Sequence, residues 1–129
     1  MRLLIVEDSQ LIRKVTRLAF PPREHDLFDA EDGQAALKLV DAATEPFDAI
    51  LLDLNMPRMD GCQFIQALRQ RARHRDTPVV LATSERETSQ LLINARKLNP
   101  AAVVKKPWKP QELAALVRGI VERPGKGKE

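Results

Sequence analysis

Short, mainly apolar runs alternate with stretches of helical periodicity along this chain, and this alternation restricts the possible folds more than any other feature. A strand that is buried on both faces of a sheet has such a composition. The sequence predicts four strong strands and one weaker candidate that contains two acids. The strong runs are 3–6 (LLIV), 48–54 (DAILLDL), 78–83 (PVVLAT) and 101–104 (AAVV), and the weaker one is 25–30 (HDLFDA).

Apolar residues recur at helical spacing in the segments that follow each run. The first segment ends at Pro21-Pro22, the second runs from Gly33 to near Pro46, the third begins at Gly61, and the last follows Pro110. Five alternations of strand and helix are typical of βαβ units, whose crossovers are right-handed. We therefore predict an α/β fold, a doubly wound parallel sheet of five strands with helices on both faces. The apolar positions are Leu11, Ile12, Val15 and Leu18; Leu37, Val40 and Ala43; Phe64, Ile65 and Leu68; Leu91, Leu92, Ala95 and Leu98; and Leu113, Leu116, Val117 and Ile120.

Length and composition limit the class of protein. A chain of 129 residues with 43% hydrophobic and 30% charged residues is expected to form one globular domain. Its single cysteine, Cys62, excludes an internal disulfide framework and favours a reducing, cytoplasmic setting. Apolar runs are too short to cross a bilayer, so we expect no membrane association. We place the domain at residues 1–121 and a basic flexible tail, or the start of a linker, at 122–129.

The unusual polar residues follow the predicted strands at their carboxyl ends, where open α/β sheets bind ligands. Glu7 and Asp8 follow the first run, Asp53 lies in the apolar run around it, Thr83 ends the next strong run, and Lys106 follows the last one. A buried, isolated carboxylate is unfavourable, and three together repel one another. A hard divalent cation such as Mg²⁺ removes this repulsion and commonly pairs with phosphate oxygens. A lysine and a hydroxyl would then suit a phosphoryl group.

Four motifs in this order resemble the receiver domain of two-component response regulators. They are VED after the first strand, DLNMPRMDG around the third, LATS at the fourth and KKPW after the fifth, and the similarity spans about residues 1–121. The resemblance implies a flavodoxin-like fold with strand order 2-1-3-4-5. It also implies a phosphoacceptor signalling domain rather than an enzyme that turns over a substrate.

The resemblance assigns a role to each site residue by motif position. Asp53 would accept a phosphoryl group from a phosphohistidine. Asp8, Asp53 and the backbone carbonyl of Asn55 would ligate Mg²⁺, with Glu7 acting mostly through a water. Lys106 would hold the phosphoryl oxygens, and Thr83 would move toward them after transfer. Asn55 and Glu85 are polar and would flank the path of a hydrolytic water, as in chemotaxis-type receivers.

Three positions depart from the family pattern. Val103 stands where many receivers carry Tyr or Phe, which puts the usual output switch in doubt. Asn99-Pro100 replaces Gly-Ala before the last strand, and Asn tolerates a left-handed backbone there. Glu7 replaces the commoner aspartate.

Alternative functions lead to different expectations. Glu7 and Asp8 could simply cap the first helix, because acids favour helix N-termini. A Mg²⁺-dependent aspartate-nucleophile phosphatase would carry an Asp-x-Asp pair, whereas Asn55 stands at the second acid position here. An N-terminal receiver of a longer DNA-binding or enzymatic regulator requires the natural chain to continue beyond Glu129.

We expect protein partners for this chain. The candidates are a sensor histidine kinase or phosphotransfer protein, a downstream target protein, and a second copy of the chain. The second copy would bind through the face that the fourth helix, fifth strand and fifth helix form. The arginines at 69, 71, 73 and 75 are more consistent with a solvated helix end than with a nucleic-acid patch.

Overall fold

Five parallel strands form the centre of the computed structural model, which describes residues 1–123. Their order in the sheet is β2-β1-β3-β4-β5, so both the doubly wound fold and the strand order expected from the resemblance are confirmed. The strands are β1 (Arg2–Val6), β2 (Asp26–Ala30), β3 (Ala49–Asp53), β4 (Val79–Thr83) and β5 (Ala102–Lys105). The helices are α1 (Gln10–Leu18), α2 (Gly33–Ala42), α3 (Gly61–Arg69), α4 (Gln90–Arg96) and α5 (Pro110–Val121), with a short 3₁₀ helix at Ala72–His74.

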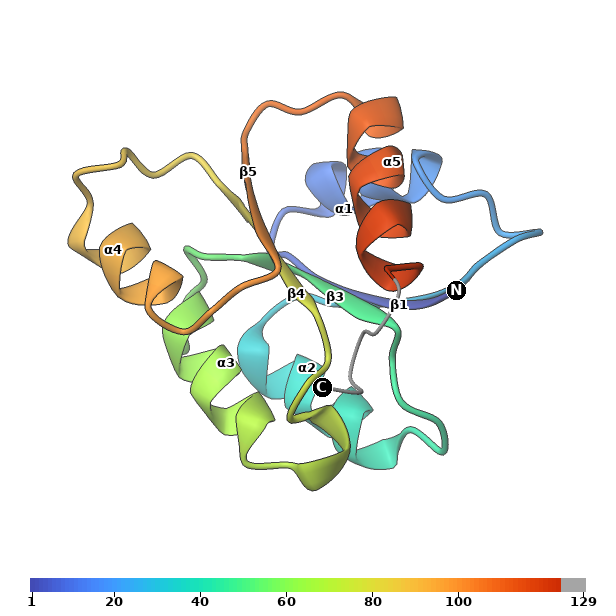
Figure 1. The fold of residues 1–129 in the computed structure, drawn as a ribbon, viewed down its shortest axis with the longest axis horizontal. Coiled ribbons are helices and arrows are strands. Elements are labelled where there is room, and N and C mark those ends of the chain that lie inside the picture. The colour runs from blue at the N-terminus through green and yellow to red at the C-terminus, as the bar shows by residue number, and fades with distance from the viewer. Residues whose placement is uncertain (124–129) are drawn as a thin grey trace.

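The sheet separates two apolar cores. Figure 1 shows α1 and α5 on one side of the sheet and α2 and α3 on the other. Alternate residues of one strand enter different cores, because successive side chains of a strand point to opposite faces. In β1, Leu4 and Val6 pack with residues of α2, α3 and α4, whereas Leu3 and Ile5 pack with residues of α5. Every residue of β3 is buried, which explains its nearly continuous apolar run.

The edge strand β2 is less buried than the central ones. Asp26 is exposed, the next three residues are half-buried, and only Ala30 is buried. Side chains at a sheet edge reach solvent, so acids are tolerated there, and the sequence pattern of this strand is correspondingly weak.

Helix α1 buries only part of the apolar stripe that its sequence suggests, because Ile12 and Val15 are half-buried while the other two members face solvent. Leu11 and Leu18 are 71% and 76% exposed, although such stripes normally face the core. The helix instead turns the neighbouring stripe, which contains Thr16, toward the protein. The Thr16 hydroxyl donates to the backbone carbonyl of Ile12 at 2.7 Å, so burying it leaves no polar group unpaired.

The basic stretch after α3 supports the backbone. Arg69 donates to the carbonyls of His74 and Thr77, Arg71 forms a bidentate pair with Asp41, and Arg73 donates to the carbonyl of Ala43. The prediction of a simply solvated helix end was incomplete, because these guanidinium groups are already engaged by the protein.

The connection before β5 contains a left-handed residue. Asn99 adopts a φ of 56°, which confirms the left-handed turn expected before β5. Within residues 1–123, helices are too short or too polar to span a bilayer. Most of the predicted tail, residues 124–129, lies outside the described part of the chain.

Candidate functional site

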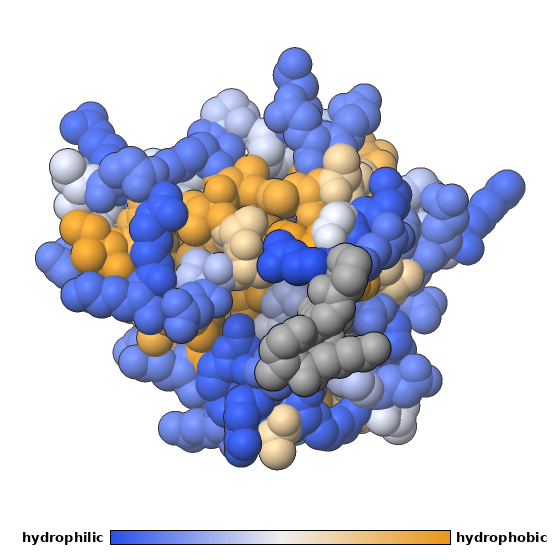
Figure 2. Space-filling view, viewed as in Figure 1, coloured by the Kyte–Doolittle hydropathy of each residue, from blue (hydrophilic) through white to orange (hydrophobic). Residues whose placement is uncertain are grey.

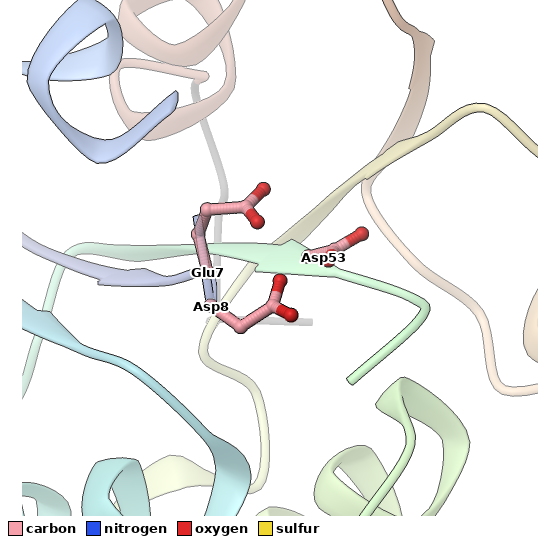
Figure 3. A group of neighbouring side chains, drawn as sticks. All are labelled: Glu7, Asp8 and Asp53. Carbon is pink, nitrogen blue, oxygen red and sulfur yellow. The ribbon is translucent and has the colours of Figure 1, made fainter. Parts of the chain in front are cut away.

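Three carboxylates converge at the carboxyl ends of β1 and β3. One oxygen from each of Glu7, Asp8 and Asp53 lies within 4.8 Å of the other two, and Figure 3 shows the side chains directed into one space. Glu7 and Asp53 are only 4% and 7% exposed, whereas Asp8 is exposed. Glu7 and Asp8 follow β1, which lies beside β3 in the sheet, and this adjacency brings the three acids together.

Helix capping does not account for these acids. The N-cap of α1 is Ser9, whose hydroxyl accepts the backbone N–H of Ile12 at 3.2 Å. Glu7 accepts the backbone N–H of Ser9 through Oε2 at 3.0 Å. The acids therefore lie before the capped end and face the site.

Lys106 is the cation of the cluster. Its Nζ lies 2.8 Å from Glu7 Oε1 and 3.3 Å from Asp53 Oδ1, and its side chain is 18% exposed. The lysine is therefore closer to Glu7 than to Asp53, whereas the sequence indicated only a role toward phosphoryl oxygens. Glu7 has protein donors on both oxygens, so its carboxylate is the most constrained of the three.

Burial and charge set the protonation of the site. Burial raises the pKa of Asp53 above its usual value, against the lowering effect of Lys106. Burial likewise raises the pKa of Glu7, although the hydrogen bond from Lys106 opposes it. Burial alone would lower the pKa of Lys106, but the hydrogen bond to Glu7 and the charge of Asp53 raise it overall. The site thus holds a charged lysine beside carboxylates that are unfavourably desolvated.

This donor set fits a hard divalent cation. Carboxylate oxygens from two strand ends, one of them solvent-accessible, are ligands that Mg²⁺ accepts while it keeps several waters. A positive charge placed among them would offset the desolvation that raises the two carboxyl pKa values.

Thr83 lies at the end of β4, next to this cluster. It is 1% exposed and follows Ala82, the register partner of Asp53. Its hydroxyl accepts the backbone N–H of Glu85 at 2.9 Å. The hydroxyl is therefore held toward the loop that leads to α4.

Asn55 links two loops across the site. Its backbone N–H points to Asp53 Oδ1 at 3.4 Å, and its side-chain amide donates to Glu85 Oε2 at 2.5 Å. Glu85 Oε1 in turn accepts the hydroxyl of Ser89, the N-cap of α4, at 2.5 Å. The sequence pointed to Asn55 and Glu85 as separate residues near a water path but did not predict this connection.

The loop after β3 is shaped by two polar contacts. Arg58 has a φ of 67° and its guanidinium pairs with Asp32, the N-cap of α2, at 2.6 Å. Asp60 caps α3, with a reciprocal capping box to Gln63. A positive φ is uncommon outside glycine and indicates a loop held in a specific conformation. Arg58 and Asp60 of the DLNMPRMDG motif thus shape this loop.

Comparison with known proteins agrees with this geometry. The profile of the response regulator receiver domain matches residues 3–118. The chain is 34% identical over 125 residues to the phosphate regulon transcriptional regulatory protein PhoB of Klebsiella pneumoniae. The match covers 95% of this chain and 52% of that protein. It is 29% identical over 121 residues to the transcriptional regulatory protein SrrA of Staphylococcus aureus, covering 94% of this chain and 48% of that protein. The chain thus spans about half the length of these curated relatives.

Solved structures include close matches to the fold. The chemotaxis protein CheY4 of Vibrio cholerae superposes with a TM-score of 0.82 at 27% identity, covering 92% of this chain and 97% of that one. The receiver domain of the Francisella response regulator 1452 matches with a TM-score of 0.78 at 27% identity, and the match covers 95% of this chain and 97% of that one. Acids, a lysine and a threonine lie at the ends of the expected strands, and the family profile matches residues 3–118 of the 129. The chain therefore belongs to the response regulator receiver domain family.

Proposed function

We propose that this receiver domain accepts a phosphoryl group on Asp53 in a Mg²⁺-dependent reaction and thereby changes its protein contacts. The observation that carries the proposal is the position of Asp53, which has carboxylate oxygens of Glu7 and Asp8 within 4.8 Å and the Lys106 ammonium 3.3 Å from its Oδ1. This arrangement places a carboxylate oxygen where a cation and a lysine can both stabilise a transferring phosphoryl group.

The residues of the chain have distinct parts in the reaction. An Asp53 oxygen forms the new P–O bond while the P–N bond of a donor phosphohistidine breaks, and the imidazole leaves with that electron pair. Mg²⁺ held by Asp8, Asp53 and the Asn55 carbonyl, with Glu7 nearby, would offset the negative charge of the carboxylates and the phosphoryl oxygens. Lys106 orients those oxygens through its ammonium group. Thr83 exchanges its bond from Glu85 for one to a phosphoryl oxygen.

The donor must contact the surface around the site, and α1 offers an apolar one. A hollow of about 390 Å³ lies beside Lys106, and its lining includes Leu11, Val15 and Trp108. Large apolar side chains that stay exposed next to a reactive site often mark a protein contact. We assign this surface to the sensor histidine kinase or phosphotransfer protein that carries the phosphohistidine.

A second apolar surface lies over β5. Figure 2 shows it between α4 and α5, bordered by hydrophilic residues. Ile93 is 37% exposed, and Val103 and Leu116 are partly exposed. This surface is the proposed contact for a downstream target or for a second copy of the chain. Sedimentation with and without beryllofluoride would distinguish them, because only a dimer increases the mass of the isolated protein.

The phosphorylation test uses mass spectrometry. Incubation with Mg²⁺ and a small acyl-phosphate donor should add one phosphoryl mass to the wild type and none to Asp53→Asn. Asp26→Asn is the matched control, since Asp26 is an exposed carboxylate at the start of the edge strand β2. Persistence of the adduct in Asp53→Asn would refute the assignment. Lack of turnover with a phosphomonoester would separate this function from that of an aspartate-nucleophile phosphatase.

A further inference from the structure

Lys105 and Lys106 are adjacent at the end of β5 but contact different parts of the molecule. Successive residues of a strand direct their side chains to opposite faces. Lys106 enters the acidic cluster, and its backbone N–H donates to the carbonyl of Thr83 at 2.9 Å. Lys105 is the register partner of Thr83, and its side chain extends to the loop between β4 and α4, residues 84–89.

Lys105 holds this loop through two groups. Its ammonium donates to the backbone carbonyl of Glu85 and lies 3.0 Å from Glu87 Oε2. Glu87 is also paired with Arg96 of α4, at 3.0 Å from Oε1. The loop is thereby connected to β5 on one side and to α4 on the other.

The backbone of Glu85 is also the group that holds Thr83. Its N–H donates to the Thr83 hydroxyl at 2.9 Å, while its carbonyl accepts from Lys105. Lys105 therefore stabilises the loop position in which the Thr83 hydroxyl is occupied. Movement of this hydroxyl toward Asp53 would draw it away from the Glu85 N–H.

We propose that Lys105 is a positioning residue that stabilises the unphosphorylated arrangement of the β4–α4 loop and opposes the movement of Thr83 toward the phosphoryl group. This inference rests on the proposed function. A contact present in only one of two arrangements lowers the affinity for any ligand that selects the other. Lys105 thus sets how readily phosphorylation changes the loop, without touching the phosphoryl group.

The first test measures beryllofluoride binding in the presence of Mg²⁺, followed by the fluorescence of the single tryptophan, Trp108. Lys105→Met should bind about two- to fivefold more tightly than the wild type, the range for exposed charged contacts. Lys105→Arg should restore wild-type affinity, because a guanidinium can still donate to the carbonyl and to Glu87. Lys97→Met, which removes an exposed lysine in the C-cap of α4, should leave affinity unchanged. Equal or weaker binding by Lys105→Met would overturn the proposal.

The second test does not depend on phosphorylation. Amide hydrogen exchange of Glu85 in the unligated protein should be several-fold faster in Lys105→Met than in the wild type or Lys97→Met, since the N–H is no longer held on Thr83. Unchanged exchange would refute the role of Lys105 whatever the ligand does. Faster exchange in a chain whose wild type fails to bind beryllofluoride through Asp53 would refute the proposed function but support the loop contact.

Discussion

The side-chain amide of Asn55 and the carboxylate of Glu85 are joined by a 2.5 Å hydrogen bond, although the residues belong to loops after different strands. Asn55 lies two residues after Asp53, and Glu85 lies two residues after Thr83. The bond therefore joins the loop that follows the proposed phosphoacceptor to the loop that follows Thr83. Hydrogen bonds to Ser89 and Asn55 lower the pKa of Glu85, so its carboxylate is ionised in this position.

We predict that a phosphoryl group on Asp53 is short-lived and is hydrolysed without a separate phosphatase. Two polar side chains beside the acyl phosphate can orient an attacking water, whereas an apolar side chain would exclude it. Asn55→Leu should lengthen the half-life of the adduct in Mg²⁺ by several-fold, measured by loss of the phosphoryl mass. Asn94→Leu in α4 is the control and should match the wild type. An adduct that persists for many hours in the wild type would contradict this prediction.

The stability of the chain without a cation should increase when Asp53 is replaced. Burial raises the pKa of Asp53, which means that the ionised carboxylate is less favourable in the folded than in the unfolded chain. Asp53→Asn removes this charge and should raise the free energy of unfolding at pH 7 by about 1 kcal/mol, the common size of a single-residue effect.

The pH dependence of this gain in stability follows from the direction of the Asp53 pKa shift. With a raised pKa in the folded state, the folded chain binds more protons, so wild-type stability falls as pH rises from the usual carboxyl range through the raised value. The advantage of Asp53→Asn should thus be full above the raised pKa of Asp53 and disappear as pH falls through that window. Urea unfolding at several pH values measures it, and Mg²⁺ should stabilise the wild type more than the variant. A variant less stable than the wild type at pH 7 would show that the bond to Lys106 outweighs desolvation.

Exposed leucines on α1 should affect phosphoryl transfer from a protein donor but not from a small-molecule donor. Leu11 borders the hollow beside Lys106, and Leu18 lies two turns further along the helix. Leu11→Ala should slow phosphorylation by a cognate kinase about fivefold, because truncating an apolar anchor at the centre of an interface weakens binding by about 1 kcal/mol or more. Its rate with an acyl-phosphate donor should equal that of the wild type. Leu116→Ala, on the other apolar surface, is the matched control, and an equal effect of both variants on kinase transfer would argue against α1 as the contact.

Residue patterns predicted the elements and the site members, but not the contacts between loops. The apolar runs of β1, β3 and β4 are informative because both faces of these strands are buried, whereas β2 lies at the edge. In α1 the pattern was misleading, since a threonine whose hydroxyl bonds to its own helix can occupy the core.

The contacts of Lys105 and Asn55 were not predictable in this way. Each depends on the separation of two loops about twenty to thirty residues apart in sequence, and on side-chain directions that no periodicity encodes. A carboxylate such as Glu85 could equally have been solvated. Only the packing of β4 between β3 and β5 places its loop within reach of both partners.

The last prediction concerns how the phosphoryl signal reaches the surface. Val103 is partly buried, is the register partner of Leu81 in β4, and packs against the core on the α2–α3–α4 side of the sheet. A valine is β-branched and stiff at χ1, and it has neither a ring that can swing nor a hydroxyl that can change partner. It cannot respond to movement of Thr83 as an aromatic residue would, and the chain contains no tyrosine at all.

We therefore expect the response to be confined mainly to the loop after Thr83 and the start of α4. This loop carries the groups that must change partner when the Thr83 hydroxyl moves, namely the Glu85 N–H and the contacts to Asn55 and Lys105. Backbone amide shifts measured with and without beryllofluoride and Mg²⁺ should be large at Ser84–Ser89 and small at Val103. Thr83→Ala should abolish the loop response because it removes the hydroxyl that selects the new arrangement, whereas Val103→Ala should retain it. Loss of the response in Val103→Ala but not in Thr83→Ala would instead mean that β5 transmits the signal.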